Sequence, residues 1–121
     1  MIAVIGSTGQ LALSLKKYEP NWTYLSRSEL DLSNPDCIRD FFSSKKAKWI
    51  INLAAYTQVD KAEDEPAVAF KINRDASALL AQCCENYIYI STDYVFSGVG
   101  NTPWKETDPT GPVNVYGETK L

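Results

Sequence analysis

Two residues near the end of the chain have the types and spacing that acid–base chemistry needs. Tyr116 and Lys120 are four positions apart, so they share one face if the segment is a helix. An ammonium group beside a tyrosine favours the phenolate and lowers a tyrosine pKa from about 10 toward neutral pH. Such a tyrosine can pass a proton to or from a carbonyl oxygen. The spacing is common by chance, so its meaning depends on what accompanies it.

A further hydroxyl residue, Thr92, follows a short apolar run. If that run is a strand of an open parallel sheet, Thr92 lies at its carboxyl end, where such sheets bind their ligands. The alternative is that Thr92 only caps the end of the strand.

A glycine-containing loop follows the first apolar run, in the segment Gly6-Ser7-Thr8-Gly9-Gln10-Leu11-Ala12. Gly6 allows a tight turn off a strand, Gly9 removes a side chain where a pyrophosphate would approach, and Ala12 is small enough for close helix packing. Free N–H groups at the start of the helix would then face the anion. The pattern predicts a dinucleotide site, and an ordinary strand-to-helix turn is the alternative.

The end of the second apolar run bears on which dinucleotide binds. A site for NAD(H) has an acid about 20 residues after the glycine loop, where it holds the ribose 2′-hydroxyl. Here Ser26 takes that position and Arg27 follows it, a combination that suits a 2′-phosphate. We expect NADP(H) to be preferred and NAD(H) to be possible, unless Arg27 is an ordinary solvated surface charge.

Apolar runs alternate with helical patterns along the chain. The expected strands are Met1 to Ile5, Trp22 to Leu25, Trp49 to Leu53 and Tyr87 to Ile90. The expected helices are Leu11 to Tyr18, a helix starting at Asn34-Pro35, Pro66 to Cys83 and a helix from Val113, with a turn at Asn86 and a loop from Ser97 to Pro112. This order predicts an α/β fold with a doubly wound, Rossmann-type parallel sheet of about four strands, ordered 3-2-1-4.

Composition limits the possible functions. The 121 residues suit one domain, and a formal charge of −3 without a Lys/Arg run argues against nucleic-acid binding. The chain has no histidine, which excludes Ser-His-Asp, Cys-His and His-ligated zinc chemistry within it. Cys37, Cys83 and Cys84 form no pairing or metal pattern, so we expect reduced thiols in the cytoplasm. We find no membrane-length apolar run and no signal peptide.

Four segments together resemble the extended short-chain dehydrogenase/reductase family, and within it the dTDP-4-dehydrorhamnose reductases. They are Arg27 to Leu32 (RSELDL), Asn52 to Glu63 (NLAAYTQVDKAE), Ser91 to Phe96 (STDYVF) and Val115 to Leu121 (VYGETKL). The resemblance extends over essentially the whole chain. It implies NAD(P)H-dependent reduction of the 4-keto group of dTDP-4-dehydrorhamnose to dTDP-rhamnose, with a nucleotide sugar as substrate.

The resemblance also implies a role for each matching residue. Tyr116 is the general acid for the C4 oxygen, Lys120 binds the nicotinamide ribose and favours the ionised tyrosine, and Thr92 hydrogen-bonds the same oxygen. The other implied contacts are Gly9, Gln10 and Leu11 with the pyrophosphate, Asp31 and Leu32 beside the adenine, Ala54, Ala55 and Tyr56 along the dinucleotide, and Asp93 and Tyr94 with the substrate.

Several of these residues have a purely structural alternative. Tyr56, Tyr94 and Tyr116 are aromatic, so each could be a half-buried packing residue. The charged run from Asp60 to Glu65 is expected to be a solvated face. Trp104 is expected to cover the loop around it rather than to bind a sugar.

The family's chains continue after the Tyr-x-x-x-Lys helix through two more strands and a small substrate domain. We therefore expect residues 1–121 to form an NAD(P)-binding domain that is incomplete, with the substrate domain absent. Such a chain is expected to show no turnover alone, and to self-associate as a homo-oligomer or be completed by another segment. The alternative is a non-catalytic nucleotide-binding or regulatory protein, like the regulatory subunit of methionine adenosyltransferase. Chance motif matches on a doubly wound domain are a third possibility.

Overall fold

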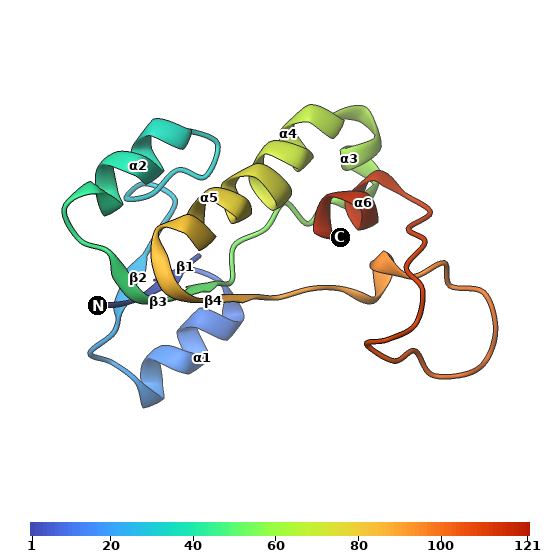
Figure 1. Ribbon diagram of the computed structural model, residues 1–121, viewed down its shortest axis with the longest axis horizontal. Helices are drawn as coiled ribbons and strands as arrows, with labels where there is room; N and C mark the ends of the chain where they lie inside the picture. Colours follow the sequence, from blue (N-terminus) through green and yellow to red (C-terminus); the bar gives the residue numbers. More distant parts are fainter.

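Four parallel strands form a single sheet in the computed structural model, which describes residues 1–121 (Figure 1). They are β1 (Ile2–Ile5), β2 (Thr23–Leu25), β3 (Ala47–Asn52) and β4 (Cys84–Tyr89). β1 pairs with both β2 and β3, and β3 pairs with β4. Every pair is parallel, as the alternation of strands and helices predicts.

The strand order is β2-β1-β3-β4, so the predicted order 3-2-1-4 is wrong. After β2 the chain crosses back over β1 instead of adding its next strand outside β2. Val4 and Ile5 of β1 are 0% and 1% exposed, as expected for an inner strand covered on both faces. The segment 26–34 forms no strand beyond β2, but it sends Leu30 and Leu32 into the core from a turn.

Helices cover both faces of the sheet, as a doubly wound fold requires (Figure 1). Helix α1 (Gln10–Tyr18) lies on one side, and α2 (Pro35–Ser43) and α5 (Ala76–Gln82) lie on the other. The remaining elements are α3 (Val59–Asp64), α4 (Pro66–Phe70), the π-helix η1 (Lys71–Asp75), the 3-10 helix η2 (Asp93–Val95) and α6 (Val115–Lys120). Not one of these helices combines the length and apolarity needed to span a membrane.

The main core lies between the sheet and helices α2 and α5. Its fully buried members include Ile5, Leu30, Ile38, Ile50 and Leu80. A smaller cluster of Ala62, Ala69 and Tyr116 joins α3, α4 and α6. The short helix α6 is therefore held by packing against elements that precede it by some fifty residues rather than by its own length.

The start of α2 agrees with the prediction made from Asn34-Pro35. Asn34 Oδ1 accepts hydrogen bonds from the N–H groups of Asp36 (3.1 Å) and Cys37 (3.3 Å). Pro35 occupies the first helical position, where its missing N–H leaves no bond unmade. This cap fixes where the chain turns back over the sheet.

The junction between α5 and β4 differs from the prediction. Cys83 caps α5, and Cys84 already pairs with Ala47 in the sheet. The turn therefore lies at Cys83, and Asn86 is a strand residue whose side-chain amide donates to a β3 carbonyl oxygen at 3.1 Å. Cys83 and Cys84 therefore lie in different elements. β4 pairs with β3 along the full length of β3. It therefore begins at Cys84, before the apolar run from which the strand was predicted.

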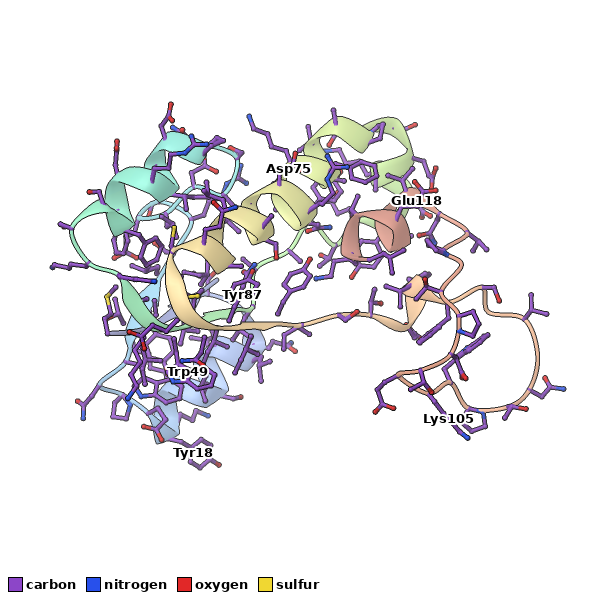
Figure 2. The ribbon with its side chains drawn as sticks, viewed as in Figure 1. Tyr18, Trp49, Asp75, Tyr87, Lys105 and Glu118 are labelled. Carbon is purple, nitrogen blue, oxygen red and sulfur yellow. The ribbon has the colours of Figure 1, made fainter.

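Tyr87 of β4 connects the sheet to α5 (Figure 2). Its hydroxyl lies 2.7 Å from Ser77 Oγ on α5 and accepts a 3.0 Å hydrogen bond from Asn52 Nδ2 at the end of β3. Burial is the main reason that the pKa of Tyr87 is raised. The Tyr87 hydroxyl thus stays protonated and ties the carboxyl ends of two strands to one helix.

A long segment without regular structure leads from η2 to α6 and extends away from the sheet (Figure 1). Within it the Trp104 ring stacks on the Phe96 ring, with centroids 4.8 Å apart, so Trp104 packs inside the loop as expected. Asn114 Oδ1 accepts the Gly117 N–H at 2.7 Å and caps α6. The loop therefore returns to a defined helix start, two residues after the predicted one.

Candidate active site

The glycine loop joins β1 to α1 and lies against the segment that follows β3. Gly6 has a φ of 90°, a conformation that favours glycine. A Cβ on Gly6 would come within 2.9 Å of the Ala54 backbone nitrogen. Gly9 precedes α1, and its N–H donates to the Gly6 carbonyl oxygen at 3.0 Å. The loop therefore places the N-terminus of α1 at the carboxyl end of β1, as predicted.

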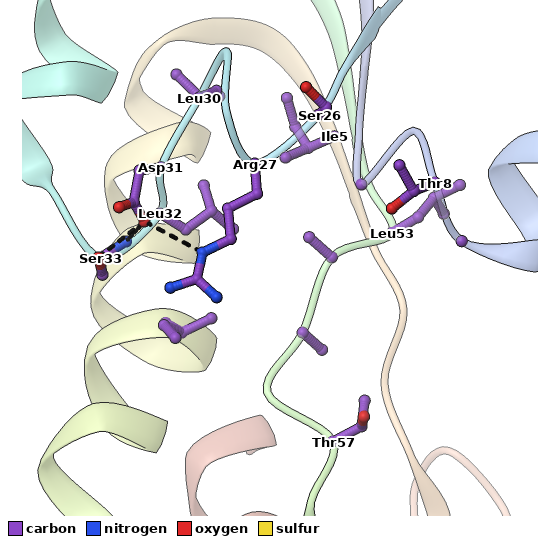
Figure 3. A pocket seen from close by; sticks show the side chains of 15 residues that line it. Ile5, Thr8, Ser26, Arg27, Leu30, Asp31, Leu32, Ser33, Leu53 and Thr57 are labelled. Carbon is purple, nitrogen blue, oxygen red and sulfur yellow. Dashed lines mark hydrogen bonds and ion pairs between the residues drawn. The ribbon is translucent and has the colours of Figure 1, made fainter.

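A cavity of about 310 Å³ lies beside this loop (Figure 3). It is bordered by the residues that follow β1, β2 and β3. The predicted cofactor residues that line it are Gly6, Gly9, Ser26, Arg27, Asp31, Leu32, Ala54 and Ala55. The fold thus brings three separate segments of the sequence to one site.

The cavity also has lining residues that the sequence did not single out. Most are immediate neighbours of predicted ones, whereas Ile72 comes from the distant π-helix η1. The complete set of these additions is Ile5, Thr8, Leu30, Ser33, Leu53, Thr57 and Ile72. Sequence proximity to the motifs would have found all of them except Ile72.

Four predicted cofactor residues lie outside the cavity lining, namely Gln10, Leu11, Tyr56 and Lys120. Gln10 and Leu11 begin α1, and the Leu11 side chain is exposed. Tyr56 packs against the cluster that contains Tyr116, and its hydroxyl donates to Glu65 Oε2 at 2.9 Å. The packing alternative therefore describes the Tyr56 side chain in this structure.

Arg27 extends across the cavity toward Asp31 (Figure 3). Its Nε lies 4.0 Å from Asp31 Oδ1, and its side chain is 83% exposed. Asp31 also accepts hydrogen bonds from the Ser33 hydroxyl (2.8 Å) and N–H (2.9 Å). These bonds, the hydroxyl first, lower the pKa of Asp31, so it is ionised at neutral pH. The weak, solvated pair leaves the Arg27 guanidinium available to a ligand.

Ser26 is already engaged with a carboxylate. Its N–H and its hydroxyl both donate to Glu29 Oε2, at 2.8 Å and 2.7 Å. The bond from the Ser26 N–H is the largest cause of a lowered Glu29 pKa. Glu29 is absent from the residues predicted for the site, although Ser26-x-x-Glu29 has the spacing of a helix-capping pair.

Tyr116 and Lys120 are both buried on α6, with 9% and 6% exposure. The Tyr116 ring packs edge-on against the Tyr94 ring, with centroids 5.6 Å apart. Lys120 Nζ donates to the Ile90 carbonyl oxygen at 2.6 Å and lies 3.8 Å from the Tyr89 ring centroid. No hydrogen bond joins the Lys120 ammonium to the Tyr116 hydroxyl. Lys120 therefore ties α6 to the carboxyl end of β4.

Burial lowers the pKa of Lys120 to about 8. The cause is desolvation, since an ammonium group removed from water loses hydration. The Ile90 carbonyl and the Tyr89 ring are the partners that offset part of this loss. Lys120 is thus a cation at neutral pH that releases its proton in weakly alkaline solution.

Thr92 caps the 3-10 helix η2. Its Oγ1 accepts the Tyr94 N–H and donates to Asp93 Oδ1, both at 3.3 Å. Thr92, Asp93 and Lys120 also line an open groove of about 640 Å³ beside the 96–114 loop. Tyr94 is 45% exposed outside that lining. Residues predicted to supply the hydroxyl, carboxylate and ammonium groups therefore line one groove, whereas Tyr116 is not part of its lining.

Asn73 is a buried polar residue that the sequence analysis missed. It lies in η1 and is 1% exposed. Its Oδ1 accepts the Tyr56 N–H at 2.7 Å, and its Nδ2 donates to the Tyr56 carbonyl oxygen (3.0 Å) and to Thr119 Oγ1 (2.9 Å). The Asn73 carbonyl oxygen accepts the Tyr89 hydroxyl at 2.9 Å. The sequence does offer a signal for Asn73, because a side-chain amide on the apolar face of a predicted helix must find hydrogen-bond partners when it is buried.

The charged run at residues 60–65 has specific partners. Glu63 Oε1 accepts the Val115 N–H at 2.9 Å, at the start of α6. Glu65 accepts the Tyr56 hydroxyl and pairs with Lys61 at 3.3 Å. Asp60, Lys61, Glu63 and Asp64 are exposed, as the prediction of a solvated face requires, and Glu65 is half-buried. The two glutamates nevertheless hold α6 and the Tyr56 segment, which come from elsewhere in the sequence.

The parallel sheet, the glycine loop and helices on both faces define an α/β protein of the Rossmann type. A family model described as the RmlD substrate binding domain matches residues 1–121, and the chain belongs to that family.

The relatives agree with this assignment over nearly the whole chain. A dTDP-4-dehydrorhamnose reductase of Sinorhizobium fredii is 41% identical over 99% of this chain and 43% of its own length. A reductase of that name from Clostridium acetobutylicum has a similar structure, with a TM-score of 0.89 and 35% identity over 98% of this chain and 45% of its own. One from Bacillus anthracis, in complex with NADP, has a TM-score of 0.86 and 30% identity, over 98% and 45%. The chain thus spans less than half the length of these relatives.

Proposed function

We propose that the cavity beside the glycine loop binds a nicotinamide dinucleotide, with which the protein reduces the 4-keto group of dTDP-4-dehydrorhamnose to dTDP-rhamnose. One observation carries this proposal. The cavity follows the carboxyl ends of β1, β2 and β3, and the groove lined by Thr92 and Lys120 follows the carboxyl end of β4. Both therefore lie at one edge of the same parallel sheet, where ligands of such sheets bind. The relatives named dTDP-4-dehydrorhamnose reductase support the choice of substrate.

The proposed cofactor is NADP(H), with NAD(H) as a weaker alternative. The glycine loop and the start of α1 (Gly6, Gly9, Gln10, Leu11) face the pyrophosphate, since free N–H groups at a helix N-terminus favour an anion. The exposed Arg27 guanidinium binds the 2′-phosphate beside Ser26. Asp31 and Leu32 flank the adenine, and Ala54, Ala55 and Tyr56 follow the dinucleotide. The complex of the Bacillus anthracis relative with NADP supports this choice.

The proposed chemistry needs one hydride and one proton, which together convert the ketone into a hydroxyl group. The reduced nicotinamide supplies the hydride to C4. Tyr116 gives its hydroxyl proton to the C4 oxygen, Lys120 binds the nicotinamide ribose and favours loss of that proton, and the Thr92 hydroxyl donates a hydrogen bond to the same oxygen. Asp93 and Tyr94, beside Thr92 at the groove, contact the nucleotide sugar.

We further infer that residues 1–121 form the NAD(P)-binding domain of this reductase, with the substrate domain outside them. The length of the relatives supports this division, because the chain spans 43% of the Sinorhizobium fredii enzyme. The proposed setting is the cytoplasm, supported by three free cysteines, and the proposed assembly is a homo-oligomer. Nucleic acid and membrane are not proposed as partners.

The first test is cofactor binding by the chain. Titration with NADPH and with NADH, followed by nicotinamide fluorescence, should show saturable binding of both and tighter binding of NADPH. If neither NADPH nor NADH binds, the proposed function is wrong.

The second test is turnover by the protein as it occurs in the cell. Adding dTDP-4-dehydrorhamnose should consume NADPH, and Tyr116→Phe should abolish this consumption while leaving NADPH binding intact. Tyr18→Phe is the matched control, because Tyr18 is 82% exposed at the far end of α1 (Figure 2). Cofactor binding without keto-sugar reduction would instead identify a non-catalytic nucleotide-binding protein.

A further inference from the structure

The turn that follows β2 folds a carboxylate back onto the end of the strand. The N–H groups of Glu29 and Leu30 both donate to the Ser26 carbonyl oxygen, at 3.1 Å and 2.9 Å. This tight turn aims the Glu29 side chain at Ser26, where Oε2 receives the Ser26 N–H (2.8 Å) and hydroxyl (2.7 Å). The Ser26 hydroxyl is also 2.9 Å from the Ser28 hydroxyl. The donors at the end of β2 are therefore already bound to an anion.

These donors are the ones that a phosphate at the 2′-position of a ribose would use. A phosphate ester is bound by N–H groups, hydroxyl groups and guanidinium, and here the Ser26 N–H, the Ser26 hydroxyl and Arg27 supply one of each. Two anions cannot accept the same two hydrogens, and they repel each other at contact distance. Glu29 Oε2 thus occupies a position that a 2′-phosphate oxygen needs.

A ribose that carries a plain 2′-hydroxyl presents the opposite case. A hydroxyl can donate to a carboxylate, and Glu29 Oε1 has no partner in the structure. An acid beside the ribose hydroxyls is the usual feature of an NAD(H) site. Although residue 26 is a serine, the turn supplies a carboxylate at that place from residue 29.

We propose that Glu29 determines cofactor specificity by competing with the 2′-phosphate of NADP(H) for the donors of Ser26. Binding of NADP(H) displaces the Glu29 carboxylate, whereas NAD(H) binds with Glu29 in place. This inference rests on the proposed function, namely that the cavity takes a nicotinamide dinucleotide.

The charges around Glu29 indicate that the competition tunes the preference rather than forbidding one cofactor. Glu29 is exposed, so its carboxylate regains hydration when it turns away from Ser26, and the net cost is only about that of one charge-assisted contact. Lys16 of α1 is the cation that acts on it electrostatically, and Arg27 is held only by the long contact with Asp31. Once Glu29 turns away, both cations remain to attract the phosphate. The arrangement therefore predicts a protein that accepts both dinucleotides.

The rival explanation is that Glu29 only caps the turn, as a glutamate does in the pattern Ser-x-x-Glu. The two explanations differ in what removal of the charge does. A structural cap holds the cavity wall for both dinucleotides alike, so its loss weakens both. A competing anion opposes only the dinucleotide with the extra phosphate.

The test compares Glu29→Gln and Glu29→Ala with the unmodified chain by fluorescence titration of NADPH and NADH. Glutamine keeps an oxygen that can accept from Ser26, so the turn is preserved while the charge is lost. We expect the ratio of NADH to NADPH dissociation constants to rise by about tenfold in Glu29→Gln, the size of a lost charge-assisted contact, and at least as much in Glu29→Ala. Glu85→Gln is the control, since Glu85 is an exposed carboxylate on β4 at the opposite edge of the sheet, and it should leave the ratio unchanged.

Each outcome decides the matter. Equal weakening of both dinucleotides in the two Glu29 variants identifies a structural cap and overturns the inference, while the proposed function stands. An unchanged ratio with tight binding of both dinucleotides also overturns it. If the unmodified chain binds neither dinucleotide, the proposed function fails and the inference fails with it.

Discussion

Asn73 Nδ2 donates a 2.9 Å hydrogen bond to Thr119 Oγ1, and both residues are buried. The bond joins the π-helix η1 to α6, the helix that carries Tyr116 and Lys120. The same Asn73 side chain holds the backbone of Tyr56 through two further bonds. One amide therefore fixes the position of α6 relative to the segment that leaves the cavity wall.

Replacing this amide should lower stability clearly. Asn73→Ala leaves the half-buried N–H and carbonyl oxygen of Tyr56 without these partners, so we expect a loss of about 2–4 kcal/mol in the free energy of unfolding. Asn86→Ala removes a single exposed amide bond and should cost less than about 1 kcal/mol. Urea denaturation of the two variants measures the difference, and equal losses would contradict the role given to Asn73.

The stability of the chain should depend on Lys120 in alkaline solution. The Lys120 pKa is about 8 in the folded state and 10.5 for the ordinary group. Between these values the unfolded state holds a proton that the folded state has released, so stability rises with pH. The gain amounts to roughly 3 kcal/mol across the interval. Below pH 8 the folded chain bears the full cost of burying the Lys120 ammonium. The gain in stability at higher pH arises because the folded chain loses that charge.

Lys120→Met isolates this effect, because it removes the titrating group and keeps the side-chain length. Urea unfolding of both proteins from pH 7 to 10.5 should show the unmodified chain gaining stability relative to Lys120→Met as pH rises. A difference that does not vary with pH would show that burial does not shift the Lys120 pKa.

A side chain at Gly117 should displace α6. Alanine is usually better than glycine in a helix by about 1 kcal/mol. At Gly117, however, an added Cβ would overlap the Tyr94 carbonyl oxygen and lie 3.0 Å from Pro112 Cβ. We expect Gly117→Ala to destabilise the chain by about 1–3 kcal/mol. At Gly111 the nearest atom, Ser97 Cβ, is at an ordinary 3.7 Å, so thermal unfolding of Gly111→Ala should match the unmodified chain.

The sequence predicts that the chain self-associates through the edge strand around Tyr87 to Ile90 or the helix faces beside it, unless another segment completes it, and the edge strand can be tested directly. β4 is the edge strand next to β3, and Ile88 on it is 40% exposed. Exposed apolar edges favour pairing with another chain, and a lysine there opposes it. Ile88→Lys should therefore reduce the mass measured by gel filtration with light scattering. Leu13→Lys changes a still more exposed apolar residue on α1 (53%) and should have no effect. A monomeric unmodified chain would refute the prediction.

Local chemistry explains why parts of the fold and site were predictable. The Gly6 turn, the Asn34 cap and the cavity residues beside the motifs depend on a few neighbouring positions, where residue type and spacing determine the conformation. The parallel pairing also follows from the alternation of strands and helices. These features place most of the predicted cofactor residues around one cavity.

The features that sequence analysis missed depend on distant segments. The strand order depends on where the crossover after β2 returns, and the apolar residues Leu30 and Leu32 enter the core from a turn instead of a strand. Asn73 meets Thr119 across 46 positions, and Glu63 meets Val115 across 52. The residues near Asn73 and Glu63 in the sequence do not show where α6 packs. The contacts that η1 and α3 make with α6 could therefore not be predicted.

The all-parallel sheet has a consequence for the time course of folding. Its closest strand partners in sequence, such as Ala3 and Thr23, are 20 positions apart, and Trp49 pairs with Asn86. The sheet has no hairpin, so chain closure over an intervening helix must precede every strand pair. Topologies of this kind fold slowly compared with helical bundles of similar size. Strands that wait unpaired expose their edges, so the yield of refolding should fall as protein concentration rises.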